Sequence, residues 1–317
     1  MSQVTQTSKR IIANIETVIV GKRRQIVLTL ASLYCEGHLL LEDVPGVAKT
    51  ILARALAGSI GCLFKRVQCT PDLLPTDVTG TSVFNQKTSE FEFRPGPVFA
   101  NIVLADEINR ATPRTQSSLL EAMAESSVSI DGTTYALKQP FFVVATQNPV
   151  DHEGTFALPE AQLDRFFMKF GLGYPNMEEE IRMLALLRDE HPIARLNPVA
   201  TGEEILACRK AVREVRVGEK IVHYITTLVH RTREHEELAL GGSPRASIAL
   251  YRASQALAAI QGRDYVLPDD VQQVAQPTLA HRMIVRPECR LRKVTAEGVV
   301  KEIIENTPVP THHDAAE

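Results

Sequence analysis

The sequence lacks a long apolar run, an apolar N-terminal leader, a paired cysteine motif and a strong excess of either charge. No stretch approaches the ~18 consecutive apolar residues of a membrane-spanning helix, and the N-terminus reads as a polar leader entering an amphipathic helix. The formal net charge of -3 gives no global nucleic-acid signature, although a local basic channel is compatible with it. These absences predict a cytoplasmic protein without a membrane span.

The five cysteines are scattered, and no two of them have the C-x-x-C spacing of zinc or redox motifs. Buried, reduced thiols are therefore expected at positions 35, 62, 69, 208 and 289. A hydrophobic content of 44% allows sizeable cores without disulfides or metals, and the length of 317 residues predicts about two domains.

What the sequence does contain is an alternation of helices and strands in its first half. Apolar residues at helical spacing predict helices over residues 8–20, which Gly21 ends, and over 22–35. Apolar runs predict buried strands at residues 38–41, 101–106, 141–147 and 166–170. Strands that alternate with helices imply an α/β sandwich around a parallel sheet.

Two hairpin inserts are predicted within this half, at about residues 82–97 and 127–138, the second around an Asp-Gly turn. The second half then continues as helix after helix, with no strand pattern. We therefore expect a nucleotide-binding α/β domain, a helical domain and a disordered polar tail over residues 1–174, 175–306 and 307–317.

A phosphate-binding loop is indicated between an apolar strand and the helix that begins at Lys49. Residues 43–50, DVPGVAKT, have the spacing of G-x-x-x-x-G-K-[ST], with Asp43 and Ala48 in place of the two glycines. Asp tolerates a left-handed backbone, Ala adds only a methyl group, and N–H groups at a helix N-terminus favour phosphate. Lys49 would neutralise the β and γ phosphates of ATP, and Thr50 would coordinate Mg²⁺. The alternative is an ordinary Pro-Gly turn before a helix.

Polar residues follow two further apolar strands. Asp106 and Glu107 come at the carboxyl edge of the predicted sheet, where α/β proteins bind their ligands. Asp106 would hold Mg²⁺ and Glu107 would activate water as general base, although solvated acids at a strand end give the same pattern. Asn148 follows the next strand, where its amide could orient the water or belong to a simple Asn-Pro turn.

Four runs of residues, in linked order with the loop, carry a family resemblance. They are DEINRATPRTQSSLLEAMAE at residues 106–125, ATQNP at 145–149, LPEAQLDRF at 158–166 and GGSPRA at 241–246. Together they closely resemble the MoxR family of AAA+ ATPases, and the likeness spans nearly the whole chain. It implies an AAA+ P-loop NTPase αβα sandwich followed by an all-α lid. It further implies ATP and Mg²⁺ as ligands, and a homo-oligomeric ring, commonly a hexamer, with ATP between neighbouring subunits.

The resemblance also assigns roles to individual residues. Asn148 stands at the sensor-1 position, Arg165 would be the finger that reaches a neighbour's ATP, and Arg245 would be sensor 2. The sequence supports an anion beside Arg245, because the preceding Ser-Pro pair places this cation in the first turn of a helix. A surface salt bridge is the alternative for Arg245, and a carboxylate such as Asp164 is the alternative partner for Arg165.

Further nucleotide contacts follow from the same likeness. Val20 and Gly21 fit the family's adenine-contacting segment, and a glycine that only ends a helix is the alternative. The remaining expected contacts lie in and after the loop, at Val44, Pro45, Gly46, Val47, Ala48 and Ile51. The two hairpins look like the helix-2 and pre-sensor-1 inserts of this clade, which usually face the ring pore or a client.

The resemblance implies an ATP-driven ring that remodels or matures a partner protein, often one with a von Willebrand factor A-type domain. This chain shows no such domain of its own, so a separate client is expected. A nucleic-acid motor of the same clade is one alternative, but the tip of the second hairpin, residues 130–134, carries no Lys or Arg. A nucleotide-gated scaffold with little turnover and a P-loop small-molecule kinase are the others, and the Ser-Pro-Arg helix start at 243–245 argues against the kinase.

Overall fold

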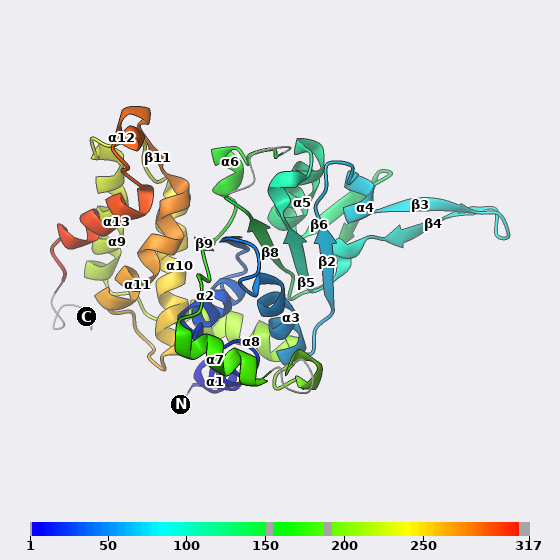
Figure 1. The fold of residues 1–317 in the computed structure, drawn as a ribbon, viewed down its shortest axis with the longest axis horizontal. Coiled ribbons are helices and arrows are strands. Elements are labelled where there is room, and N and C mark those ends of the chain that lie inside the picture. Colours follow the sequence, from blue (N-terminus) through cyan, green and yellow to red (C-terminus); the bar gives the residue numbers. More distant parts are fainter. Residues whose placement is uncertain (1, 150–154, 187–191, 311–317) are drawn as a thin grey trace.

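The chain folds around a five-stranded parallel sheet with strand order β2-β5-β8-β1-β9 (Figure 1). The computed structural model describes residues 2–149, 155–186 and 192–310. The strands are β1 Leu39–Glu42, β2 Phe64–Gln68, β5 Ile102–Asp106, β8 Phe142–Gln147 and β9 Met168–Phe170. The α/β class predicted from the apolar runs is therefore confirmed.

The edge strand β2 is missing from the sequence prediction because its side chains are mostly polar. Lys65 and Arg66 are exposed, and Val67 is the one residue of the strand that is buried. A strand at the edge of a sheet is covered less than a central one, so it needs no continuous apolar run. β2 pairs along its whole length with β5, and this register places Gln68 opposite Asp106.

Six α-helices lie in the described residues of the sheet-forming part, 2–149 and 155–174. They are α1 Gln3–Glu16, α2 Arg23–Tyr34, α3 Lys49–Ser59, α4 Pro75–Thr79, α5 Pro113–Glu125 and α6 Glu160–Leu163. The first helix begins and ends earlier than predicted, because the Ser2 hydroxyl accepts the Thr5 N–H and the Thr17 hydroxyl donates to the Asn14 carbonyl. Gly21, with a φ of 75°, therefore turns the chain after the helix and does not end it.

Over its described residues, 175–186 and 192–310, the second half is helical as predicted, with one short antiparallel pair of strands. Its helices are α7 Met177–Leu186, α8 Gly202–Arg213, α9 Glu219–Glu234, α10 Pro244–Ile260, α11 Pro268–Leu279, α12 Pro287–Leu291 and α13 Ala296–Glu305. β10 Leu238–Leu240 pairs with β11 Ile284–Val285, and strands this short leave no alternation for a sequence pattern to detect.

The predicted tail, residues 307–317, lies outside the described residues from position 311 onward. Its first residue, Thr307, is buried, and its hydroxyl donates to the Ile303 carbonyl of α13. Within the described part of the chain, no helix is long and apolar enough to cross a membrane.

Two antiparallel hairpins extend from the sheet domain. β3 Gly80–Asn85 pairs with β4 Glu90–Pro95, and β6 Ser127–Ile130 pairs with β7 Thr133–Ala136. Figure 1 shows the β3–β4 hairpin projecting far beyond the rest of the molecule. Phe93 of β4 stacks on Tyr135 of β7, with ring centroids 4.4 Å apart, so the two hairpins are packed against each other.

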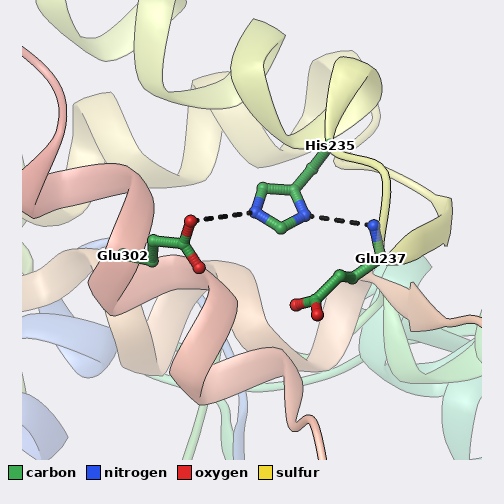
Figure 2. A group of neighbouring side chains, drawn as sticks. All are labelled: His235, Glu237 and Glu302. Carbon is green, nitrogen blue, oxygen red and sulfur yellow. Dashed lines mark hydrogen bonds and ion pairs between the residues drawn. The ribbon is translucent and has the colours of Figure 1, made fainter. Parts of the chain in front are cut away.

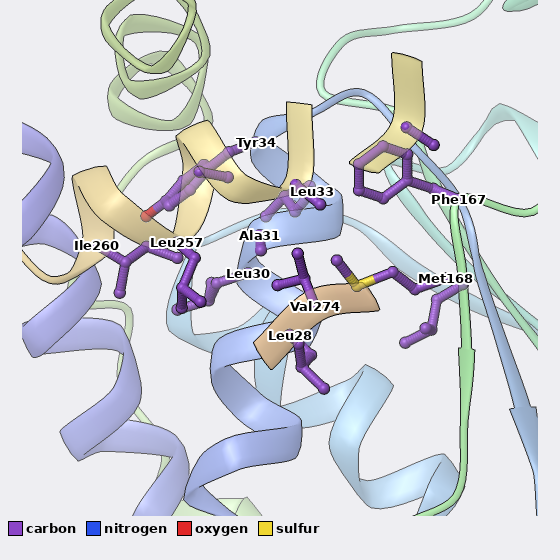
Figure 3. Packing of buried hydrophobic residues seen from close by; sticks show 14 of the residues in the cluster. Leu28, Leu30, Ala31, Leu33, Tyr34, Phe167, Met168, Leu257, Ile260 and Val274 are labelled. Atoms are coloured by element: carbon purple, nitrogen blue, oxygen red, sulfur yellow. The ribbon is translucent and has the colours of Figure 1, made fainter. Parts of the chain in front are cut away.

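One hydrophobic core joins the two halves of the chain. Alternate residues of β5 face opposite sides of the sheet, so Ile102 and Leu104 belong to one apolar cluster and Val103 belongs to another. The first cluster continues from α1, α2 and α3 into α8, α9, α10 and α11. Figure 3 shows its centre, where Leu30 of α2 lies among side chains of the C-terminal helices, including Leu257 of α10.

Candidate functional site

The loop between β1 and α3 is curled by two left-handed residues. Gly46 and Ala48 have φ values of 88° and 64°, and Ala48 is the N-cap of α3. The first N–H groups of α3 have no partner within the helix, so this end of the helix favours phosphate. The side chain of Lys49 lies over the loop, with Nζ 2.5 Å from the carbonyl oxygen of Asp43 and 3.3 Å from that of Val44.

Asp43 does not have the left-handed backbone that we expected at the first-glycine position. Its Oδ1 accepts the Val44 N–H at 3.0 Å, and its Oδ2 accepts the Gly173 N–H at 2.6 Å. The carboxylate thus ties the phosphate loop to the segment that follows β9. Hydrogen bonding, and not backbone freedom, accounts for an aspartate at this position.

Asp106 is the last residue of β5 and Glu107 follows it, and Thr146 of β8 connects them. The Thr146 hydroxyl donates to Asp106 Oδ1 at 2.7 Å and accepts the Glu107 N–H at 2.8 Å. Asp106 is 9% exposed, and its Oδ2 accepts hydrogen bonds from Arg66 Nε at 3.0 Å and Nη2 at 2.7 Å. Burial lowers the pKa of the Lys49 ammonium, and nearby carboxylates, including these two, oppose that shift.

Glu107 has a left-handed backbone with a φ of 56°, which is uncommon for a residue with a side chain and is typical of functional sites. Its Oε2 accepts hydrogen bonds from Arg110 Nη1 at 3.0 Å and Gln68 Nε2 at 3.4 Å. Arg66 and Gln68 of β2 therefore reach the acidic pair, and the sequence analysis missed both. Only the pairing of β2 with β5 brings them there, and no motif marks it.

A pocket of about 340 Å³ adjoins the phosphate loop. Its lining includes Val18, Ile19, Val20, Lys22, Pro45, Gly46, Val47, Ala48, Ile51, Gly173, Tyr174, Pro175 and residues of α7. Lys22 closes one side, because its Nζ donates to the Tyr174 carbonyl at 2.9 Å and lies 3.8 Å from Glu179 Oε2. Gly21 has a φ of 75°, a conformation that residues with a side chain rarely adopt, so this position favours glycine.

Arg165 and Arg245 lie together, lining a different pocket of about 610 Å³ beside α5 and α6. Arg165 Nη1 donates to the Leu120 carbonyl at 3.0 Å. Arg245 Nη1 lies 3.6 Å from Asp164 Oδ2, and its side chain is 71% exposed. The sequence left open whether a carboxylate such as Asp164 pairs with Arg165. In the described residues, Asp164 pairs with Arg245 and not with Arg165.

The residues around the phosphate loop fit a magnesium nucleotide. Thr50 lies in the first turn of α3, and Asp106 supplies a carboxylate, so hard oxygen donors of the kind that Mg²⁺ prefers are at hand. Lys49 and the start of α3 supply positive charge for phosphates, and the adjoining pocket offers apolar walls to a base. Asn148 directly follows β8 and is 6% exposed.

A second group of candidate metal ligands, His235, Glu237 and Glu302, lies in the helical half (Figure 2). His235 Nδ1 accepts the Glu237 N–H at 3.3 Å, and its Nε2 lies 3.8 Å from Glu302 Oε1. Both ring nitrogens of His235 thus have a neighbour within the protein. The group is therefore a link between the end of α9 and α13.

The parallel sheet, the phosphate loop and the acidic pair define a P-loop nucleotide-binding protein. The family model described as "ATPase family associated with various cellular activities (AAA)" matches residues 38–168, and "AAA lid domain" matches residues 230–303. The chain belongs to the MoxR family of AAA ATPases, as its motifs predicted.

Two relatives and one solved structure document this membership. Chaperone MoxR1 of Mycobacterium tuberculosis is 40% identical over 96% of this chain and 82% of its own length. The "Uncharacterized protein YeaC" of Bacillus subtilis is 54% identical over 96% of this chain and 95% of its own. The crystal structure of a "putative ATPase" from Cytophaga hutchinsonii is 38% identical, with a TM-score of 0.89 over 97% of this chain and 96% of that one.

Proposed function

We propose that this protein binds Mg-ATP at the phosphate loop and hydrolyses it. The observation that carries the proposal is the arrangement of Asp106 and Glu107, in which one hydroxyl on the neighbouring strand, that of Thr146, binds the Asp106 carboxylate and the backbone N–H of Glu107. Both carboxylates attract the Lys49 ammonium and oppose the lowering of its pKa by burial. Membership in the AAA ATPase family implies nucleotide binding, and this geometry adds a group that can activate water.

Each residue has a distinct proposed task. Lys49 would exchange the loop carbonyls for the β and γ phosphates, while Thr50 and Asp106 would hold Mg²⁺, which offsets phosphate charge when bound. Glu107 would accept a proton from the attacking water at its carboxylate, and Asn148 would help to orient that water. Val20 and the apolar loop residues would contact the base.

We further propose that ATP lies between subunits of a homo-oligomeric ring, in which Arg165 and Arg245 complete a neighbour's site. Support comes from their placement, since both line one pocket and neither lines the pocket beside the phosphate loop. Two cations on one surface would meet the γ phosphate of the next subunit together. The ring size expected for this family is six.

The work driven by hydrolysis is proposed to be the remodelling or maturation of a separate protein in the cytoplasm. One relative is named a chaperone, which supports this direction. A partner with a von Willebrand factor A-type domain remains our first candidate. We retain the division at residues 174/175 as the boundary between nucleotide-binding domain and lid, and we propose that the projecting β3–β4 hairpin reaches the client.

The test is Glu107→Gln, compared with wild type and with Glu305→Gln, a surface carboxylate on α13. Loss of a general base should lower ATP turnover by about 10²–10⁴-fold, while ATP binding is retained. Phosphate release and binding of a fluorescent ATP analogue would be measured side by side. Equal turnover in wild type and Glu107→Gln would refute the assignment, and binding without turnover in wild type would favour a nucleotide-gated scaffold.

A nucleic-acid motor is the rival within the same clade. The tip of the β6–β7 hairpin carries Asp131 and Gly132 and no cation, so it would repel a phosphate backbone. Salt-dependent stimulation of the ATPase by single-stranded DNA would restore this rival.

A further inference from the structure

Arg282, which no motif singles out, is almost completely enclosed where the helical half meets β9. It ends the short 3₁₀ helix η4, Ala280–Arg282, and its side chain is 4% exposed. Nε donates to Asp164 Oδ1 at 3.0 Å, Nη2 to the Phe166 carbonyl at 2.7 Å, and Nη1 to the Phe167 carbonyl at 3.1 Å and to the Thr278 carbonyl. One guanidinium thus binds the chain on either side of Arg165 and the last turn of α11.

Asp164 is shared by two arginines of unlike exposure. Its Oδ1 accepts from the enclosed Arg282, and its Oδ2 faces Arg245, which is 71% exposed. Burial lowers the pKa of Arg282 to about 10, and Asp164 opposes this shift, so the guanidinium stays charged at neutral pH. The Arg282 contact is therefore fixed, whereas an exposed pair at 3.6 Å is weak and can exchange for a phosphate.

We infer that Arg282 is a positioning residue, which holds Arg165 and Arg245 ready for the ATP of a neighbouring subunit. This inference rests on the proposed function of those two arginines. Arg282 holds Asp164 in place, and Asp164 holds Arg245 next to Arg165 until a phosphate replaces the carboxylate as the partner of Arg245. Through the carbonyls of Phe166 and Phe167, Arg282 ties residues 164–167, which contain Arg165, to the lid, so that the two move together.

A role in stability alone explains the arrangement poorly. A buried ion pair is weak evidence for stability, because apolar residues of similar volume often serve a fold as well. A guanidinium, in contrast, offers five donors in a rigid fork. Here all three of its nitrogens donate hydrogen bonds, to residues 164–167 and to Thr278 of α11. Lysine keeps the charge but cannot reproduce this fork.

The test is Arg282→Lys in the assembled protein, with Arg263→Lys as matched control. Arg263 makes a bidentate pair with the fully buried Asp270 in the same half, at 2.6 Å for each contact, and lines neither pocket described above. Misplaced arginines should lower kcat about 10–100-fold in Arg282→Lys. The KM for ATP should stay within about two-fold, because nucleotide binding at the subunit's own loop is untouched. Arg263→Lys should keep the kcat of wild type.

Mixing subunits separates positioning from damage. Arg282→Lys retains Glu107, and Glu107→Gln retains its arginines, so mixed rings contain intact sites and should exceed the turnover of either variant alone. Arg165→Ala mixed with Glu107→Gln must recover in the same way if the arginines act across subunits. Failure of that pair sinks the proposed function. If the Arg165→Ala mixture recovers, two results would refute this inference alone: a wild-type kcat for Arg282→Lys, or no recovery when Arg282→Lys is mixed with Glu107→Gln. If Arg282→Lys does not fold, Asp164→Asn should show the same loss and the same recovery.

Discussion

The two parts of the candidate site are held in place by different means. Around the phosphate loop, position is set by backbone: a helix start, left-handed residues at Ala48 and Glu107, and the tips of paired strands. Around Arg165 and Arg245, position is set by long side chains: Arg245 and Arg282 meet at Asp164, and Arg165 donates to the Leu120 carbonyl. A local segment of sequence can encode the first arrangement, whereas the second exists only once the lid has packed.

The first way to sharpen this comparison is Lys49→Met, with the surface change Lys301→Met as control. Loss of the ammonium should reduce turnover by about 10²–10³-fold, because a charge aimed at the phosphates is removed. Phosphate release would be measured with each variant alone and in mixtures. Mixing with Glu107→Gln subunits should not restore activity, since both changes disable the loop side of every site. Recovery in that mixture would break the division between the two parts.

A smaller effect is expected for Thr146→Val, which keeps the shape of a fully buried residue and removes its hydroxyl. Asp106 then loses a donor and the Glu107 N–H loses its acceptor, at a cost of about 1–3 kcal/mol for the unsatisfied group. We expect kcat to fall about 10-fold, which corresponds to 1.4 kcal/mol. Thr146→Ser, which keeps the hydroxyl, should recover most of the loss. Equal kcat values for the valine and serine variants would show that the hydroxyl does not align the acids.

The smallest effect is expected for Ala48→Gly. Glycine adopts the φ of 64° without the ~1–2 kcal/mol penalty of a side chain, and part of this gain is offset by greater freedom in the unfolded chain. The free energy of unfolding in urea should therefore rise by about 0.5–1 kcal/mol. Ala57→Gly, in the interior of α3, is the control and should lower it by a similar amount. A loss in both variants would mean that the left-handed backbone does not limit stability.

The sequence predicts best those site residues whose positions depend on the local backbone. Lys49, Thr50, Asp106 and Glu107 stand in short motifs on apolar strands, so their local pattern predicts their place. Arg66 and Gln68 lie on an edge strand without an apolar run, and they reach the acids only through pairing with β5. Tyr174, before α7, and Glu179, in its first turn, come to the site through their contacts with Lys22.

Around Arg165 and Arg245, too, the sequence predicts the residues but not their contacts. Arg165 and Arg245 could be named from family motifs, but Asp164 as the partner of Arg245 could be identified only from the packed lid. Arg282 follows α11 without any motif, and 118 residues of chain separate it from the carboxylate that it binds. Contacts over such separations depend on how helices pack, which local periodicity does not encode.

The core shared by α2 and α10 has a consequence for how the chain folds. The two segments that match separate family models, 38–168 and 230–303, both rely on apolar faces supplied by helices outside their own bounds. Neither segment can bury those faces alone, so the sheet and the lid are expected to melt together as one cooperative unit. Nucleotide held at one end of that unit would then protect the far helices against unfolding by simple mass action.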